Sequence, residues 1–425
     1  MRSNGKGRCG VLRIGIVGTA RILPSHLRGM RQLLEASLAD FRVTALVGRT
    51  MEGALSFRKR GEGPMPRPPV MSGGDPLAAP HMYVSDLHPD TLPDCYTDLE
   101  AMLARGNLDA VLLLTPVGQH HAQAIRCLEA GLHVFCEKPL AVSVRAARAM
   151  VDTAARLGKT LGVAEGVFYD ATVRFQRFAV ERGEVGDVEM VLMGGFGTDT
   201  WSPDQMVART PWRHRKLEAG GGPSIDIGVH QFDHIRTVAG EVAEVMAMTG
   251  RFAPERFDRD PPGNVRQSVD CDVEDTFQAL FRLEGGGMGH VAFSWAGHGA
   301  PMRWPDSPAI YCSRGVLRGG CLIPEGGAPE PLAQYVERVA PTEVRQGWFP
   351  GGIRDTKALQ FLDFLRAIDA GRDPEASGRQ GLGDLACAFA VLESAHCGRA
   401  VTLREVLDGR ASAYQAEIDA HYGLN

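Results

Sequence analysis

Among the nine cysteines of the 425-residue sequence there is no C-x-x-C pair, and the sequence also lacks a basic run and a long apolar segment. An odd, scattered set of cysteines is typical of reduced thiols in a cytoplasmic protein and argues against a disulfide framework. Because 46 lysines and arginines stand against 51 aspartates and glutamates without clustering, we expect no nucleic-acid partner. Apolar runs such as residues 110–114 are far too short to cross a bilayer, so no membrane partner is expected either.

The N-terminal region does not have the pattern of a cleavable signal peptide. Basic residues precede an apolar segment there, but Arg13 and Arg21 interrupt the segment and no small-residue cleavage site follows. The hydrophobic fraction of 44% and the charged fraction of 23% are ordinary for a globular protein, and the length predicts about two to three domains. We therefore expect a cytoplasmic globular protein.

The first 160 residues alternate between apolar runs and segments of helical spacing. The expected strands and helices are, in chain order, residues 12–17, 24–34, 43–47, 51–60, 109–115, 121–130, 133–136 and 143–157. Strands that are apolar throughout and alternate with helices indicate a parallel sheet that is covered on both faces. Residues 61–95 are rich in proline and glycine and are interpreted as an irregular insertion into this order.

After about residue 160 the pattern changes to strands in which apolar and polar residues alternate, most clearly at residues 276–283. Two helices, residues 357–370 and 382–397, are expected near the end of the chain. We predict an α/β protein with two domains. The first is an α/β domain at residues 1–160, and the second is an α+β domain at residues 161–425 with a large, mostly antiparallel open sheet.

Gly18 stands at the turn between the first expected strand and the first expected helix. At such a turn a dinucleotide pyrophosphate meets backbone N–H groups and a helix N-terminus. The glycine motif is imperfect, because Ala20 and Leu23 occupy its second and third glycine positions. A plain tight turn explains the segment equally well.

Arg49 follows the second expected strand, where an NAD enzyme usually carries an acidic residue for the ribose hydroxyl. A carboxylate would repel a 2′-phosphate, whereas a guanidinium can pair with it through two N–H groups. The residue therefore favours NADP over NAD.

The strand at residues 133–136 leads directly into Glu137-Lys138-Pro139. Pro139 fixes its own φ and disfavours helical geometry at Lys138, so the lysine has a rigid position. A cation at the C-terminal end of a buried strand lies where open α/β sheets bind ligands. A solvated loop lysine is the alternative interpretation.

A second cluster follows a run of three glycines at residues 220–222 and begins a helix expected to continue to Gly240. Asp226 and His230 are separated by four positions, so the carboxylate could orient the imidazole, or the pair could simply satisfy a buried helix. His230 and His234 have the spacing of a zinc helix, but the catalytic glutamate of that motif is absent, and we predict no metal site.

The order of these motifs resembles the Gfo/Idh/MocA oxidoreductases, the family of glucose–fructose oxidoreductase and inositol dehydrogenase. The segments that carry the resemblance are Gly15 to Ile22, Thr115-Pro116 with His120, Glu137-Lys138-Pro139 and Asp226-x-x-x-His230. The resemblance implies a Rossmann domain followed by an α+β domain whose open sheet forms homodimers or homotetramers. It also implies NAD(P)-dependent hydride transfer to or from a secondary alcohol or ketone carbon of a sugar, cyclitol or related polyol.

The resemblance also implies roles for particular residues. His230 would be the general base, Lys138 would donate a hydrogen bond to the reacting oxygen, and Asp226 would fix the imidazole. A cis peptide is expected before Pro139. The residues expected at the cofactor are Gly18, Thr19, Ala20, Arg21, Ile22, Arg49, Thr50, Thr115, Pro116, His120, Glu137, Lys138, Glu165, Trp212 and Arg213.

The sequence departs from the family pattern in two places. Val117 stands where asparagine often follows Thr-Pro, and Glu165 stands in a segment where many members have asparagine. Glu165 is therefore either a cofactor or substrate contact or an ordinary strand-end acid. The pocket walls are expected in residues 194–216 and in the sheet.

Two other functions remain open on the same scaffold. One is a redox-assisted glycoside hydrolase or lyase, and the other is a non-catalytic regulator that senses a nucleotide or a sugar. A regulator would have no need for the lysine and the Asp–His pair.

Overall fold

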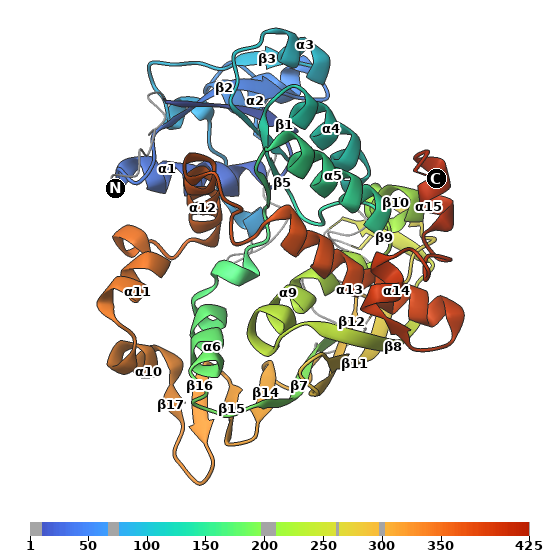
Figure 1. Cartoon of the computed structure of the whole chain (residues 1–425). Helices are drawn as coiled ribbons and strands as arrows, with labels where there is room; N and C mark the ends of the chain where they lie inside the picture. The colour runs from blue at the N-terminus through green and yellow to red at the C-terminus, as the bar shows by residue number, and fades with distance from the viewer. Residues whose placement is uncertain (1–10, 67–75, 197–209, 261–262, 297–301, 425) are drawn as a thin grey trace.

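Six short apolar strands form one parallel sheet near the N-terminus (Figure 1). The computed structural model describes residues 11–66, 76–196, 210–260, 263–296 and 302–424. The strand order is β3-β2-β1-β4-β5-β6, which is the doubly wound order of dinucleotide-binding sheets. The strands are β1 (Leu12–Val17), β2 (Phe41–Val47), β3 (Asp94–Tyr96), β4 (Ala110–Leu113), β5 (His133–Cys136) and β6 (Leu161–Val163).

Helices cover both faces of this sheet, as the continuous apolar strands predict. Helices α1 (Leu23–Glu35) and α2 (Met51–Arg58) share one apolar core with the side chains of Ile14 and Ile16. Helices α3 (Leu99–Ala104), α4 (Val117–Glu129) and α5 (Val144–Leu157) share the other core, which lies on the opposite face. Because each face of the sheet packs on a core, the strands β1, β2, β4, β5 and β6 are mostly apolar and buried.

A helix from the far end of the chain completes the first of these layers. Helix α12 (Thr356–Ala370) packs beside α1, and Phe364 stacks on Phe135 of β5 with ring centroids 5.0 Å apart. The N-terminal sheet therefore depends on residues more than 200 positions away for part of its cover.

A second, larger sheet carries the strands that follow residue 180. Its order is β17-β16-β15-β14-β7-β12-β11-β8-β18, with β13 paired to β7, and every pairing is antiparallel except that of β7 with β12. The strands are β7 (Val188–Phe196), β8 (Val242–Gly250), β11 (Thr276–Leu283), β12 (Met288–Ser294), β13 (Met302–Arg303), β14 (Ala309–Cys312), β15 (Gly315–Arg318), β16 (Cys321–Pro324), β17 (Glu330–Pro331) and β18 (Val401–Thr402). Strands β9 (Glu255–Arg259) and β10 (Val265–Asp270) form a separate pair.

One face of the larger sheet is covered by helices. In β11, Phe277, Ala279, Phe281 and Leu283 are buried, as their alternation predicts. The main helices on this side are α6 (Ala171–Glu181), α9 (Gly228–Ala239) and α13 (Gly378–Cys397). Shorter helices complete the chain: α7 (Lys216–Ala219), α8 (Pro223–Asp226), α10 (Leu332–Val339), α11 (Thr342–Trp348), α14 (Leu403–Leu407) and α15 (Ala416–His421). The 3-10 helices are η1 (Pro76–Ala78), η2 (Val84–Asp86), η3 (Val167–Tyr169), η5 (Pro211–His214) and η6 (Pro350–Gly352).

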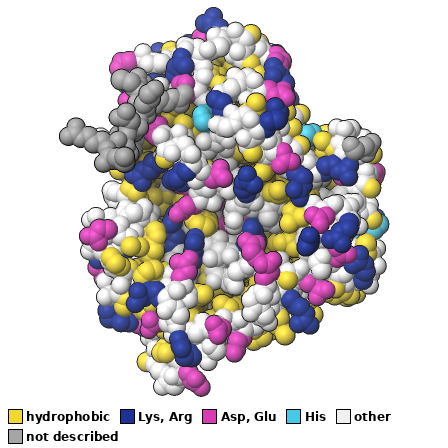
Figure 2. All heavy atoms as spheres, in the orientation of Figure 1, with side chains coloured by type: hydrophobic (Ala, Val, Ile, Leu, Met, Phe, Trp, Pro, Cys, Tyr) yellow, Lys and Arg dark blue, Asp and Glu magenta, His cyan; other side chains and the backbone are white. Residues whose placement is uncertain are grey.

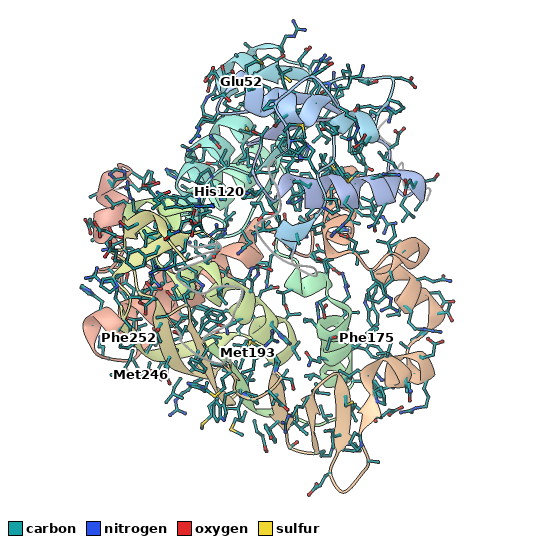
Figure 3. All side chains as sticks on the ribbon, turned by 180° about the vertical axis from the view of Figure 1, so that it is seen from behind. Glu52, His120, Phe175, Met193, Met246 and Phe252 are labelled. Atoms are coloured by element: carbon teal, nitrogen blue, oxygen red, sulfur yellow. The ribbon has the colours of Figure 1, made fainter. Side chains whose placement is uncertain are left out.

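The opposite face of the larger sheet is open and apolar. Leu280 pairs across the sheet with Met246, and Met288 pairs with Met190, and all four side chains are exposed. Met246 lies in the lower part of the molecule in Figure 3. On the face shown in Figure 2, basic and acidic side chains are intermixed. Within the described residues, no helix is long and apolar enough to cross a membrane.

Three sequence expectations need correction. Strands β3 and β6 were not predicted, because each is only three residues long and β3 overlaps the end of the expected insertion. Helix α4 begins at Val117, four residues earlier than expected. The helix expected from the glycine run to Gly240 is broken at Ile227 into α8 and α9. Residues 67–75 of the insertion lie outside the described residues. Val84, also in the insertion, is buried and packs into the core of the first sheet.

Candidate active site

The turn after β1 has room only for a glycine. Gly18 has φ +102°, its N–H donates to the carbonyl of Val47 at 2.8 Å, and a Cβ there would lie 2.8 Å from the carbonyl carbon of Leu114. The turn therefore lies directly against the ends of β2 and β4, and helix α1 begins at Leu23 immediately after it. This cradle fits a dinucleotide, because first-turn N–H groups and the positive end of the helix dipole meet the pyrophosphate there.

Lys138 and Asp226 form the centre of the site. The Lys138–Pro139 peptide is cis, as expected. The Nζ of Lys138 donates to the carbonyl of Asp226 at 2.9 Å and to its carboxylate at 3.1 Å. Arg213 lies on the other carboxylate oxygen, with its Nε at 3.3 Å. Burial alone would raise the pKa of Asp226, but the two cations outweigh it and hold this pKa well below its ordinary value.

The carboxylate that contacts His230 is Glu165, not Asp226. The Nδ1 of His230 and the Oε1 of Glu165 are 2.7 Å apart. The expected pairing of Asp226 with His230 assumed one continuous helix, and the break at Ile227 separates the two residues onto α8 and α9. The prediction that Asp226 fixes the imidazole is therefore wrong in geometry, because its carboxylate is committed to Lys138 and Arg213.

The buried carboxylate of Glu137 contacts two residues that are distant in the sequence. Its Oε1 accepts from Nζ of Lys357 at 2.8 Å and contacts Nε2 of His26 at 2.7 Å, while its Oε2 accepts the N–H of Lys138 at 3.1 Å. Burial would raise the pKa of Glu137, but Lys357 and His26 lower it further than burial raises it. The carboxylate thus ties the end of β5 to both α1 and α12 and fixes the backbone of Lys138.

His120 lies in α4 (labelled in Figure 3). Its side chain is buried, at 1% exposure. Its Nδ1 is 3.0 Å from the carbonyl oxygen of Pro139, and its Nε2 is 2.7 Å from that of Thr115. Burial lowers the pKa of His120. The sequence predicted a cofactor contact, but both ring nitrogens lie against backbone carbonyls that follow β4 and β5, and the single N–H of the neutral ring can donate to one of them. The hydroxyl of Thr115 donates to Gln123 at 2.7 Å.

The residues after β2 lie at the same edge of the sheet. Arg49 is exposed, and Thr50 caps α2 by accepting the N–H of Gly53 at 3.1 Å. The Thr50 hydroxyl therefore has a structural role, whatever it contributes to a cofactor. On the other side of the site, the guanidinium of Arg213 lies 4.5 Å from the ring centroid of Trp212.

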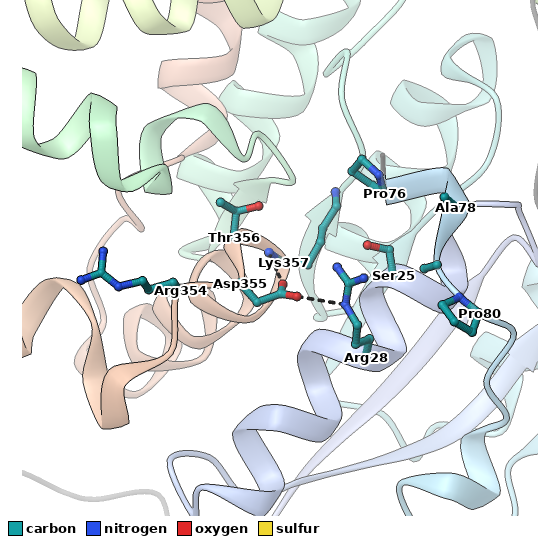
Figure 4. Close-up of a pocket in the computed structure, with 10 residues that line it drawn as sticks. Ser25, Arg28, Pro76, Ala78, Pro80, Arg354, Asp355, Thr356 and Lys357 are labelled. Carbon is teal, nitrogen blue, oxygen red and sulfur yellow. Dashed lines mark hydrogen bonds and ion pairs between the residues drawn. The ribbon is translucent and has the colours of Figure 1, made fainter. Parts of the chain in front are cut away.

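A polar cavity of about 420 Å³ lies between α1, α12 and the insertion (Figure 4). Arg28, Arg354 and Lys357 line it together with Asp355, whose carboxylate accepts from Nε of Arg28 at 3.0 Å. Ser25 also lines it, and the described residues give its buried hydroxyl no hydrogen-bond partner. Lys357 connects this cavity to Glu137 and hence to the backbone of Lys138.

Sequence reasoning missed three residues that support the site. His26 and Lys357 hold Glu137, and the buried carboxylate of Glu274 accepts the N–H groups of Gly222 and Ser224 at 2.9 and 3.1 Å. Burial raises the pKa of Glu274. No local motif marks any of these residues, because each acts on a segment at least 50 positions away.

Two family models match this chain. The GFO/IDH/MocA C-terminal domain matches residues 173–318, and the oxidoreductase family with an NAD-binding Rossmann fold matches residues 77–165. The chain is 27% identical over 312 residues to a 1,5-anhydro-D-fructose reductase of Ensifer adhaerens, covering 72% of this chain and 83% of that protein. It is 23% identical over 405 residues to a myo-inositol 2-dehydrogenase of Thermotoga maritima, covering 93% of this chain and 100% of that protein.

The fold is also that of a solved structure. The crystal structure of an oxidoreductase domain protein from Kribbella flavida superimposes with a TM-score of 0.71 at 25% identity, covering 92% of this chain and 99% of that chain. The sheet order, the glycine turn and these matches define an NAD-binding oxidoreductase, an enzyme of the hydride-transferring dehydrogenase and reductase class. The chain belongs to the Gfo/Idh/MocA family, as the motif order predicted.

Proposed function

We propose that the protein is an NAD(P)-dependent dehydrogenase or reductase that acts on a secondary alcohol or ketone carbon of a sugar, cyclitol or related polyol. The observation that carries this proposal is the meeting of Lys138, Asp226 and His230 at the C-terminal edge of the first sheet, beside the glycine turn. The relatives named above act on an anhydro sugar and on a cyclitol, which supports this substrate class.

In this mechanism the residues of the chain handle the proton and the charge. His230, whose side chain is 32% exposed, takes the proton of the substrate hydroxyl as general base. Lys138, at 20%, donates a hydrogen bond to the same oxygen and stabilises the negative charge that develops there. Bound nicotinamide supplies the acceptor or donor of the hydride. Asp226 holds the ammonium of Lys138 in place.

For the cofactor we propose NADP. Arg49 follows β2 at the ribose end of the expected binding edge, next to the N-terminus of α2. A guanidinium and a helix N-terminus together favour a 2′-phosphate. Arg49→Asp should reverse the preference and raise the KM for NADP about tenfold or more, while turnover with saturating NAD survives. Equal KM values for NADP in both proteins would contradict the proposal.

We propose that the chain divides near residue 160 into the dinucleotide-binding domain and the α+β domain, with α12 returning to the first. The substrate walls expected in residues 194–216 fall largely on residues 197–209, which lie outside the described residues. We also propose a cytoplasmic location, which the eight free cysteines among the described residues support.

The open face of the larger sheet supports a homo-oligomer. Its exposed apolar side chains include Leu280 at 60%, Met248 at 78% and Met288 at 53% exposure, on three neighbouring strands. Several exposed apolar side chains on one face of a sheet are typical of an interface. Leu280→Glu should convert the assembly to monomers in light scattering, whereas Arg282→Glu, which changes a side chain that is already polar, should do so less. A monomeric wild-type protein would contradict the proposal.

The function is tested with a panel of sugars, cyclitols and polyols, each with NAD and NADP, scored by the change in nicotinamide absorbance. We expect at least one substrate to give turnover that Lys138→Ala abolishes. Product release without a net change in absorbance would instead indicate the redox-assisted hydrolase or lyase. Binding of nucleotide with no chemistry on any substrate would indicate a regulator.

A further inference from the structure

Glu165 is the most deeply enclosed carboxylate of the site. Its side chain is 4% exposed, and its Oε1 lies 2.7 Å from Nδ1 of His230 and accepts the N–H of Val167 at 3.2 Å. Burial would raise the pKa of Glu165, but His230 and Lys138 lower it further, so the carboxylate is ionised at neutral pH. A buried carboxylate at hydrogen-bond distance from an imidazole accepts the proton on that nitrogen.

The two acids of the site have separate side-chain partners within contact distance. Asp226 is shared by Lys138 and Arg213, at 3.1 and 3.3 Å, whereas the only side chain that gives Glu165 a hydrogen bond among the described residues is His230. Because Glu165 makes no hydrogen bond to Lys138, it can stay on His230 throughout the reaction. Glu165 is thus available to balance the charge that His230 gains as a base.

We propose that Glu165 is the positioning residue of the general base: its carboxylate fixes His230 in the Nδ1–H tautomer, so that Nε2 presents its lone pair to the substrate hydroxyl. The described part of the chain gives Nε2 no hydrogen-bond partner. This inference rests on the proposed function, in which His230 is the base. In the oxidation direction the substrate O–H proton passes to Nε2, and the hydride leaves the carbinol carbon for the nicotinamide, which is reduced. Glu165 keeps its own charge and receives no proton.

The surroundings of Glu165 keep its charge directed at the imidazole. Lys138, which follows β5, and Asp226, at the end of α8, both interact electrostatically with this pair. Two buried acids, Asp233 of α9 and Asp384 of α13, also interact with Glu165, and burial raises the pKa of both. Asp384 is in turn paired with Arg236. Among the described residues near these two acids, the cation is Arg236. It is already paired with Glu241 and Asp384, so it does not compete with His230 for Glu165.

The tautomer is read directly from the ring nitrogen shifts of His230 in a ¹⁵N NMR spectrum of the whole protein, assigned by the signals lost in His230→Gln. We expect the wild type to show the Nδ1–H tautomer. Glu165→Ala should lose it and lower kcat by about 10- to 100-fold with KM changed by less than about threefold, the range seen when the partner that orients a functional histidine is removed. Glu165→Gln keeps an acceptor oxygen beside the Val167 N–H, so it should retain the tautomer and recover part of kcat.

Gln176→Ala is the matched control, because Gln176 contacts another histidine of the same helix, His234, at 2.7 Å and lies outside the site. It should change only the signals of His234 and leave kcat within about twofold. Finding His230 as the Nε2–H tautomer in the wild type, or an unchanged kcat in folded Glu165→Ala, would overturn the inference. If Glu165→Ala does not fold, the wild-type and Glu165→Gln spectra still decide. An absence of turnover by the wild type would refute the proposed function but not the tautomer assignment.

Discussion

The Nζ of Lys357 lies 2.8 Å from the Oε1 of Glu137, although 220 residues separate them in the chain. Both side chains are about nine-tenths buried. The bond attaches a C-terminal helix to the strand end that precedes Lys138. The dinucleotide-binding sheet and the rest of the chain are therefore coupled directly behind the reacting group.

Removing this lysine should lower the free energy of unfolding. Among the described residues, Lys357→Met leaves the buried carboxylate of Glu137 with His26 as its one side-chain partner, which should cost about 3 kcal/mol in the free energy of unfolding. Arg31→Met is the control, since its pair with Glu35 is 52% and 60% exposed and contributes less than about 1 kcal/mol. Urea titrations of both variants give the comparison. Similar losses in the two would contradict a special role for the buried pair.

Lys138→Ala should lower kcat by about a hundredfold or more, because the reacting oxygen loses its donor. Cofactor affinity should stay within a few-fold, since the glycine turn is unaffected. Lys59→Ala, which removes an exposed lysine after α2, serves as the control and should behave as wild type. Steady-state kinetics with titration of bound cofactor fluorescence separate the two effects. Normal turnover by Lys138→Ala would end its catalytic assignment.

Asp226→Asn should affect the lysine rather than the histidine. The neutral amide leaves Lys138 and Arg213 facing each other without their shared charge, so kcat should fall by about 10- to 100-fold. The tautomer of His230 should not change, because Glu165 still holds its Nδ1. Kinetics and ¹⁵N spectra of the same sample check this, and a loss of the Nδ1–H signal would show that Asp226 orients the imidazole after all.

Gly18→Ala should abolish cofactor binding or folding. Its φ of +102° strains any L side chain, and the new Cβ would meet the backbone of Leu114 at 2.8 Å, where nothing flexible can yield. Gly347→Ala is the matched control, because Gly347 lies in α11 with open space around its Cβ position. This variant should raise the free energy of unfolding by up to about 1 kcal/mol. Calorimetry of cofactor binding and thermal unfolding of the two variants decide the matter.

Stability should fall in mild acid because of His234. Burial lowers the pKa of His234 to about 4 from an ordinary 6.5, so between these pH values the unfolded chain binds a proton that the folded chain resists. The free energy of unfolding therefore decreases as pH falls from about 6.5 to about 4. His234→Gln should make this part of the profile less steep, whereas His396→Gln, at the exposed end of α13, should leave its slope unchanged.

Much of the fold follows from local sequence patterns. Apolar runs predicted the four longer strands of the first sheet. The alternation at Phe277 and Phe281 predicted which face of the second sheet is covered. Strands β3 and β6 escaped because three residues are too few to show a period. The cover that α12 supplies was also hidden, since periodicity shows that a helix has an apolar face but not which sheet that face contacts.

The sequence by itself determined the class of the protein, because the glycine turn, the Lys138 motif and the Asp226–His230 spacing are local features that occur in one order. Which carboxylate serves which cation was decided only by the tertiary structure. The break at Ile227 turns Asp226 toward Lys138 and Arg213, and folding brings Glu165 to His230 from 65 positions away. Contacts of that range depend on packing between separate elements, and no spacing within a single helix or strand encodes them.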